Sequence, residues 1–147
     1  MEGLVRTLDV AVMVGARGLL RGDTASRMGL IEIGKKGVTK EGLLRLGEHL
    51  SLSRSQLADI LHVSERTIRR YRRNQRSNSV VSEQVLQIAE VTARATDVFG
   101  AREPLVRWMK SPCRALGNRI PVALLRSRFG AEIVLDELGR IEHGALS

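Results

Sequence analysis

The segment 64-SERTIRRYRRNQR-76 holds six arginines and one glutamate, and it decides the fold of this chain. A helix returns to the same face at i, i+3, i+4 and i+7. Ser64, Ile68 and Tyr71 follow that spacing, so we predict one amphipathic helix that is anchored in a core through these residues. The opposite face is a ridge of four arginines, which are Arg66, Arg69, Arg70 and Arg73.

The positive charge of this chain is concentrated in the ridge segment. The formal net charge is +8, and residues 64–76 alone carry +5. Residues 1–63 have nine bases and seven acids, and residues 77–147 have nine bases and eight acids. A solvated helix face usually mixes both signs because like charges at i,i+4 repel. Such a local excess is typical of a surface that contacts a polyanion, and nucleic acid is the first candidate.

The residues before the ridge complete a helix-turn-helix pattern. Ser53 and Gln56 have the spacing of a capping box and begin a short helix. Ser64 caps the arginine helix, which leaves room only for a tight turn between the two. The positions that hold two such helices at their crossing angle are Leu57, Ala58, Leu61, Val63, Ile68 and Tyr71, all small or apolar. Clamping the second helix on one face leaves its other face free to enter the major groove of DNA.

One position departs from this pattern. The turn usually contains a glycine with positive φ, and His62 stands there. Histidine is among the non-glycine residues that adopt positive φ more readily than most. We therefore expect His62 to be tolerated in the turn.

Arginine suits base recognition because it can donate two hydrogen bonds to O6 and N7 of guanine, worth about 1–3 kcal/mol of discrimination. We assign Arg66, Arg69 and Arg70 to base edges, and Arg73 and Arg76 to phosphates. Tyr71 is expected in the core rather than as a stacking platform. The full set of candidate DNA-binding residues is Ser55, Gln56, Ser64, Arg66, Thr67, Arg69, Arg70, Arg73 and Arg76.

The start of the preceding helix, at Ser53, Ser55 and Gln56, suits phosphate contacts through backbone amides. A single helix-turn-helix module buries too little surface for tight specific binding, and such proteins generally dimerise. We therefore expect a homodimer on a pseudo-palindromic site in double-stranded operator DNA.

The composition predicts an all-α fold. The chain has 147 residues, of which 43% are hydrophobic and only 3% aromatic, so aliphatic side chains build its core. No segment shows the sustained period-two alternation of a strand. We expect a helix-turn-helix bundle followed by a small helical domain. The predicted parts are an N-terminal helical region (1–38), a helix-turn-helix DNA-binding domain (39–80) and a C-terminal domain (81–147).

Cap and stop residues delimit the other helices. Thr39 is a candidate N-cap, Ser26 and Ser82 are candidate helix starts, and Gly37 and Gly100 are candidate stops. The expected helices cover about 6–14, 26–36, 39–50, 82–99, 102–109 and 131–141. Segment 111–121 has two prolines and a glycine and is expected to be irregular, with a short helical turn after it. A tail of five or six residues ends the chain.

Several function classes are disfavoured. Cys113 is the only cysteine, which excludes an intrachain disulfide and a cysteine-based zinc site. His49, His62 and His143 lie in different segments without metal-ligand spacing, so we expect no metal, no cofactor and no enzyme activity. The early apolar run 10–14 is too short to span a bilayer and lacks a basic flank. A cytoplasmic protein without a membrane partner is expected.

The C-terminal half carries a resemblance to a known family. Its ordered marks lie within 104-PLVRWMKSPCRALGNRIPVALLRSRFGAEIVLDELGRIEHG-144. They include Trp108-Met109, Ala115-Leu116-Gly117 and 140-RIEHG-144. This segment resembles the toxin-binding domain of Xre/MbcA/ParS-type antitoxins. The segments 65-ERTIRRYRR-73 and 29-GLIEIGKKGV-38 are similar to the same family's helix-turn-helix and N-terminal region. Three departures are His62, Asn118 and His143, the last where tyrosine is common.

The resemblance implies the antitoxin of a type II toxin–antitoxin system. Such a protein sequesters a cognate toxin, usually of the RES-domain type that depletes NAD, and represses its own operon. Trp108 is expected in the core. The candidate toxin-binding residues that the resemblance implies are Arg140, Glu142, His143, Gly144, Ala145 and Leu146. The alternative is a repressor without a toxin partner, whose C-terminal half binds a small-molecule effector.

Overall fold

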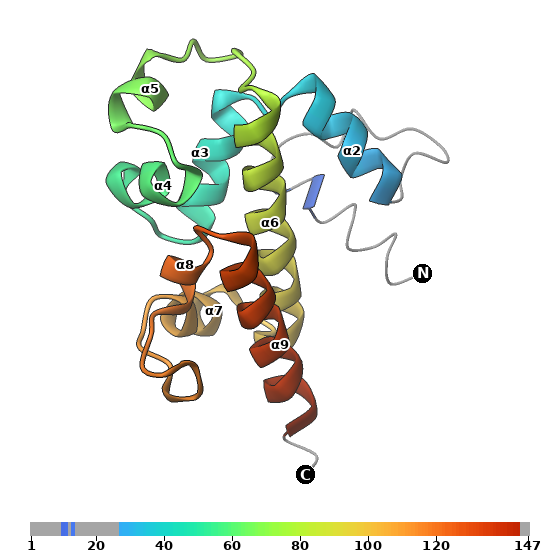
Figure 1. The fold of residues 1–147 in the computed structure, drawn as a ribbon, viewed down its shortest axis with the longest axis vertical. Coiled ribbons are helices and arrows are strands. Elements are labelled where there is room, and N and C mark those ends of the chain that lie inside the picture. The colour runs from blue at the N-terminus through green and yellow to red at the C-terminus, as the bar shows by residue number, and fades with distance from the viewer. Residues whose placement is uncertain (1–9, 12, 14–26, 145–147) are drawn as a thin grey trace. The chain divides into compact units, whose positions relative to one another are not determined.

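A computed structural model describes residues 10–11, 13 and 27–144 of the chain (Figure 1). Every regular element within 27–144 is a helix, and the β-bridges there are two isolated pairs, so the predicted all-α class is confirmed. The elements are α2 (Arg27–Lys36), α3 (Lys40–His49), α4 (Arg54–Leu61), α5 (Glu65–Arg70), α6 (Ser79–Phe99), α7 (Arg102–Met109), the 3₁₀ turn η3 (Arg114–Leu116), α8 (Pro121–Leu124) and α9 (Arg128–Gly144).

The chain divides into two compact units, Met1–Glu90 and Val91–Ser147. The predicted domain boundaries after residues 38 and 80 stay predictions. Val10, Ala11 and Met13 are helical, and the rest of the helix expected at 6–14 lies outside the described residues. The proposed cap at position 26 also lies outside the described residues. Helix α2, at Arg27–Lys36, agrees with the helix expected at 26–36.

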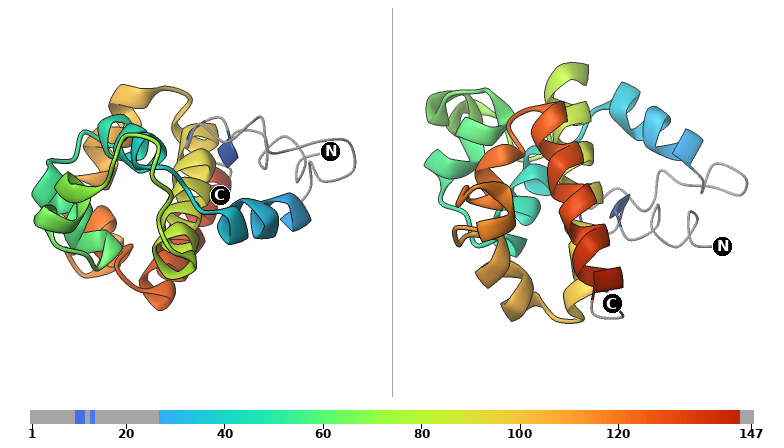
Figure 2. Two further views of the ribbon diagram at one scale, coloured as in Figure 1. Left: turned by 90° about the horizontal axis from the view of Figure 1, so that it is seen from above. Right: turned by 60° about the horizontal axis from the view of Figure 1, so that its bottom comes forward.

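The first unit is built around the apolar face of α3. Thr39 Oγ1 accepts a hydrogen bond from Gly42 N at 3.1 Å, which confirms Thr39 as the N-cap. The largest fully buried side chains of this unit are Ile33, Leu43, Leu46, Leu50, Leu57, Leu61, Ile68 and Ile88. Each contributes about 1.5–3 kcal/mol by leaving water. Figures 1 and 2 show α2 on one side of the first half of α6, and α3, α4 and α5 on the other.

The connection between α2 and α3 is fixed by contacts with the segment before α6. Gly37 ends α2 with φ +95, and a Cβ there would meet the Ser77 carbonyl oxygen, so the predicted stop is confirmed. The Ser82 hydroxyl is fully buried and accepts from Val38 N at 2.9 Å. Ser82 is therefore an internal bridge and not the start of α6. The helix begins at Ser79, where Asn78 Oδ1 caps it by accepting from Val81 N.

The second unit packs α7, α8 and α9 with the end of α6. The expected bounds of α7 are confirmed, and Leu105 and Met109 are fully buried. Trp108 is half-buried, with its ring centroid 5.5 Å from that of Phe99, so it is less enclosed than expected. The last helix is longer than expected at both ends, because Arg128–Gly144 are all helical. It lies so close to α8 that a Cβ on Gly130 would overlap the Leu124 carbonyl oxygen.

Candidate DNA-binding and partner-binding surfaces

Helices α4 and α5 form the helix-turn-helix pair that the sequence predicts. At the start of α4, Gln56 N donates to Ser53 Oγ at 3.1 Å and Ser53 N donates to Gln56 Oε1 at 2.9 Å, which confirms the capping box. His62 follows α4 with φ 60 and ψ 35, close to the ideal left-handed values. Histidine thus takes the conformation that glycine usually supplies in this turn, as expected. Ser64 then caps α5 by accepting from Thr67 N at 3.0 Å.

The arginines of α5 point away from the core. Ile68 is fully buried and holds the helix, whereas Arg66, Arg69 and Arg70 are exposed. None of these three guanidinium groups has a hydrogen bond or an ion pair with any residue that the structure describes. Ser64 Oγ and Thr67 Oγ1 lie 2.9 Å apart and share a hydrogen bond on the same exposed side. The helix therefore presents unneutralised positive charge beside two hydroxyl groups.

The predicted ridge is shorter than the helical periodicity indicates. Helix α5 ends at Arg70, because Tyr71 has an extended backbone with φ −60 and ψ 135. Arg73 is consequently not on the helix, and Tyr71 is half-buried rather than fully in the core. The side-chain spacing alone could not find this end, since neither glycine nor proline marks it. Contacts with distant residues, described next, select the extended conformation.

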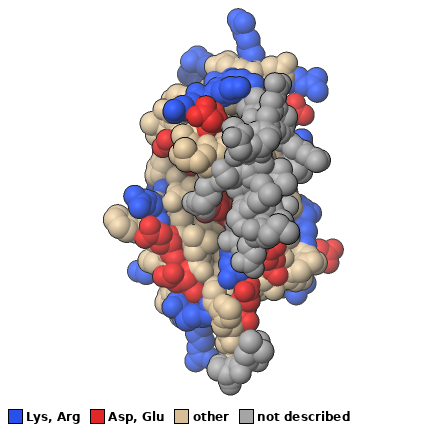
Figure 3. Space-filling model, turned by 90° about the vertical axis from the view of Figure 1, so that its right-hand side faces the viewer, with Lys and Arg blue, Asp and Glu red and all other residues tan. Residues whose placement is uncertain are grey.

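A four-residue turn, Arg72–Gln75, connects α5 to the segment before α6. Its residues are all exposed. Two cations lie at its edges: Lys40 Nζ donates to Tyr71 O at 2.9 Å, and Arg76 Nη1 donates to Gly37 O at 2.8 Å. The sequence pattern did not identify Lys40, which lies 31 residues from Tyr71. In Figure 3, lysine and arginine side chains gather at the upper end of the face shown, the end where this connection lies in Figure 1.

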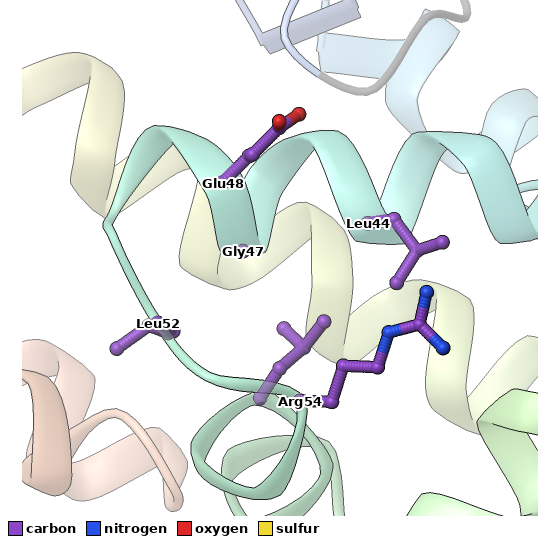
Figure 4. Close-up of a pocket in the computed structure, with 6 residues that line it drawn as sticks. Leu44, Gly47, Glu48, Leu52 and Arg54 are labelled. Carbon is purple, nitrogen blue, oxygen red and sulfur yellow. The ribbon is translucent and has the colours of Figure 1, made fainter.

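A shallow hollow of about 320 Å³ lies between α3 and α4. Its lining residues are Leu44, Gly47, Glu48, Leu52, Arg54 and Leu57. Figure 4 shows Arg54 reaching toward Leu44, while Glu48 points away from the hollow. A Cβ at Gly47 would lie 2.9 Å from Leu57 Cδ2, so a larger residue there would require the Leu57 side chain to shift. Apolar side chains and the two charged residues Glu48 and Arg54 line the hollow together.

In the second unit, the candidate toxin-binding residues lie on α9 and not in a tail. Glu142 forms an ion pair with Arg94, and Arg140 Nε donates to Glu137 Oε2 at 2.9 Å. His143 is exposed over 74% of its side chain. Gly144 is the last residue of the helix, and positions 145 and 146 lie outside the described residues. Both ion pairs involve residues in the last turns of the helix.

Sequence reasoning missed an apolar pair on the outer face of α9. Phe129 is 77% exposed and Ile133 45%, one helical turn apart. With Arg140 and His143 they follow the spacing of a single helix face. The pair was overlooked because the helix was expected to begin only at Ala131. The i,i+4 spacing of the two apolar residues, beside an Arg128–Glu132 ion pair at the same spacing, was the available signal.

No helix among the described residues combines the length and the apolar character that a bilayer crossing requires. No three of their histidine, cysteine, aspartate or glutamate side chains come together as a metal site would need.

Two protein-family models match successive parts of the chain, one in each of the two compact units. Residues 29–90 match the Antitoxin Xre-like helix-turn-helix domain, and residues 94–144 match the Antitoxin Xre/MbcA/ParS C-terminal toxin-binding domain. An Antitoxin Xre from Yersinia enterocolitica is 39% identical over 67 residues, 45% of each chain. An Antitoxin Xre from Photorhabdus laumondii is 34% identical over 94 residues, 60% of this chain and 64% of that protein. The chain thus spans about half to two thirds of these two relatives.

A third relative is matched over most of its length. The protein named Prs ADP-ribosylating antitoxin, from Sphingobium sp. strain YBL2, is 30% identical over 141 residues, 89% of this chain and 87% of that protein. The two domain matches follow one another along the chain in the order that the fold shows. The chain therefore belongs to the Xre/MbcA/ParS family of antitoxins.

Proposed function

We propose that this chain is the antitoxin of a type II toxin–antitoxin system. Its first unit binds operator DNA and represses its own operon, and its second unit sequesters the toxin. The observation that carries the DNA-binding half is the row of exposed guanidinium groups on α5, which have no partner among the described residues. Folding does not need these charges, and a groove lined with phosphates would neutralise them.

The three arginines of α5 read base edges in this proposal. Each can pair with O6 and N7 of a guanine. Ser64 and Thr67, on the same exposed side, donate hydroxyl hydrogen bonds to bases or phosphates. The first turn of the eight-residue helix α4 presents the backbone amides near Ser55 to a phosphate. Two copies of the chain, related by a two-fold axis, would place two α5 helices in successive grooves.

The test is the double variant Arg69→Ala, Arg70→Ala in the full chain. Each side chain is exposed, so the free energy of unfolding should change by less than about 0.5 kcal/mol. Binding to the DNA upstream of the chain's own gene should weaken by about 10-fold or more per arginine. Fluorescence anisotropy and thermal melting measure the two effects. Arg107→Ala, an exposed arginine on α7, is the matched control and should leave both unchanged.

A large loss of stability in the double variant would contradict a DNA-facing role, because it would mean that the arginines hold the fold. Unchanged operator affinity would equally remove the assignment. An operator affinity that depends on a small metabolite, without any protein partner, would instead support the effector-responsive repressor.

The toxin-binding half of the proposal places the contact on the outer face of α9. Phe129 and Ile133 form an apolar anchor there, and Arg140 and His143 continue the same face toward the C-terminus. Exposed aromatic residues beside basic ones are typical of interface centres. Glu142 is less suited to a direct contact, because Arg94 already binds it. The cognate toxin is proposed to be a RES-domain protein that depletes NAD.

Co-expression with the protein from the adjacent reading frame tests this face. Phe129→Ser should prevent co-purification of the two proteins and rescue of cell growth. Val80→Ser, an equally exposed apolar residue on α6 (76%), should permit both. If Phe129→Ser still neutralises the partner fully while remaining folded, the α9 face is not the toxin-binding surface.

A further inference from the structure

The turn Arg72–Gln75 is held closed by two hydrogen bonds. Gln75 N donates to Arg72 O at 2.9 Å, and Arg72 N donates to Gln75 Oε1 at 3.1 Å. The second bond uses a side chain to satisfy a backbone amide that would otherwise face solvent. The segment after α5 is therefore an ordered turn with a defined shape.

Backbone contacts also attach the turn to the start of α3. Lys40 N donates to Gln75 O at 3.0 Å, and Ser77 N donates to Val38 O at 2.8 Å. Between these bonds, Thr39 and Arg76 form an antiparallel bridge. The turn is thus fixed to the same framework that positions α3.

Two cations near the turn direct their hydrogen bonds inward, to backbone carbonyls. Lys40 is half-buried, and its Nζ lies 2.9 Å from Tyr71 O and 3.3 Å from Arg69 O. Both carbonyls belong to the C-terminal end of α5, where a positive charge is favourable. Arg76 Nη1 donates to Gly37 O in the same way. These two charges hold the backbone in place.

The side chains of Arg72 and Arg73, in contrast, bind no backbone carbonyl that the structure describes. Both side chains are exposed, and neither makes a hydrogen bond or an ion pair with any residue in the described part of the chain. They leave the ordered turn directly after α5, next to the helix that the proposed function places in the major groove. Phosphates flank such a groove on both sides.

We propose that the turn Arg72–Gln75 is a second DNA-contacting element beside α5, with Arg72 and Arg73 binding phosphates and with Lys40 and Arg76 as positioning residues that do not touch DNA. This inference rests on the proposed DNA-binding function. It changes the role of Arg76, which the sequence pattern assigned to phosphates, and it adds Arg72 and Lys40.

Salt dependence separates the two roles. The logarithm of the binding constant falls linearly with the logarithm of the salt concentration, by about 0.9 per phosphate contact. The double variant Arg72→Gln, Arg73→Gln should therefore reduce the slope by about 1.8. The same reduction should appear with the operator duplex and with a random-sequence duplex of equal length, because phosphate contacts do not read sequence. Fluorescence anisotropy at five or six salt concentrations gives both slopes.

The positioning residues should behave in the opposite way. Lys40→Met and Arg76→Gln should each keep the slope of the wild-type chain while operator affinity falls by about tenfold, the loss expected for a hydrogen bond from a charged donor. The affinity for the random-sequence duplex should change little, so the ratio of operator affinity to random-sequence affinity should also fall by about tenfold. Lys40→Arg, which can still donate to both carbonyls, should restore operator affinity. Lys35→Met removes an exposed charge on α2 that is paired with Glu32, and it should change neither quantity.

Each outcome has a separate meaning. A slope reduced by about one unit in Lys40→Met or Arg76→Gln would show that these residues contact phosphates, which overturns the positioning role. An unchanged slope in the Arg72, Arg73 double variant would remove the turn from the interface, even though the wild-type chain binds. If the wild-type chain itself fails to bind DNA, the proposed function fails and not this inference alone.

Discussion

The conformation of His62 gives a prediction that the structure makes quantitative. The residue has φ 60 and ψ 35, where a residue with a Cβ loses about 1–2 kcal/mol relative to right-handed conformations. Glycine avoids this cost but adds about 0.4–1 kcal/mol of backbone entropy to the unfolded chain. His62→Gly should therefore be more stable than His62→Ala by about 0.8 kcal/mol. Both variants remove the imidazole, so their difference reports the backbone alone.

The same pair of substitutions at Arg45 provides the control. Arg45 is exposed in the interior of α3, where glycine is about 1 kcal/mol less favourable than alanine. The order of stability should thus be inverted between the two sites. Urea unfolding followed by circular dichroism measures the order of stability. With a slope of about 2 kcal/mol/M, the midpoints should differ by about 0.4 M at position 62 and by about 0.5 M at position 45. If His62→Ala is as stable as His62→Gly, the left-handed turn does not constrain this position.

Three further predictions concern stability and are checked by the same unfolding measurement. Ile68→Ala should cost about 2–4 kcal/mol, because the side chain is fully buried beneath α5, and operator affinity should fall with it. Gly130→Ala should destabilise the second unit by more than about 3 kcal/mol, because the new methyl group overlaps the Leu124 carbonyl oxygen and α8 and α9 must separate; a change below about 1 kcal/mol would contradict that close approach. Ser53→Ala should cost about 1 kcal/mol by breaking the capping box with Gln56, and Ser53→Asn should recover most of it.

Local signals in the sequence were sufficient to locate the two helices of the helix-turn-helix and their starts, but not the end of α5. Caps at Thr39, Ser53 and Ser64 were each identified from residue type and spacing, because a cap bond joins residues only three positions apart. The positive φ of His62 was expected because this position of the helix-turn-helix pattern usually holds a glycine with positive φ. Glycines 37 and 100 marked helix ends for the same local reason, and both have positive φ.

Features that depend on distant residues were not predictable in this way. Lys40 donates to two carbonyls at the end of α5, 29 and 31 residues away, and no periodicity contains that information. Ser82 resembled a cap by its position, yet Val38 uses its hydroxyl from across the unit. Glu142, which was expected to lie in the tail, is instead helical and forms an ion pair with Arg94, 48 residues away. The exposed pair Phe129 and Ile133 was not predicted, because α9 begins at Arg128 and not at Ala131.

The arginines of α5 are independent of the scaffold that carries them. Ile68 and the Ser64 cap hold the helix, whereas the three guanidinium groups are exposed and bind no other residue that the structure describes. Substitutions at positions 66, 69 and 70 are therefore close to neutral for stability. If α5 reads operator bases as proposed, a duplicated copy of the gene would acquire a different operator through a few point changes, without compensating changes in the core. Under the same proposal, closely related copies in one genome would diverge until each regulates only its own operon.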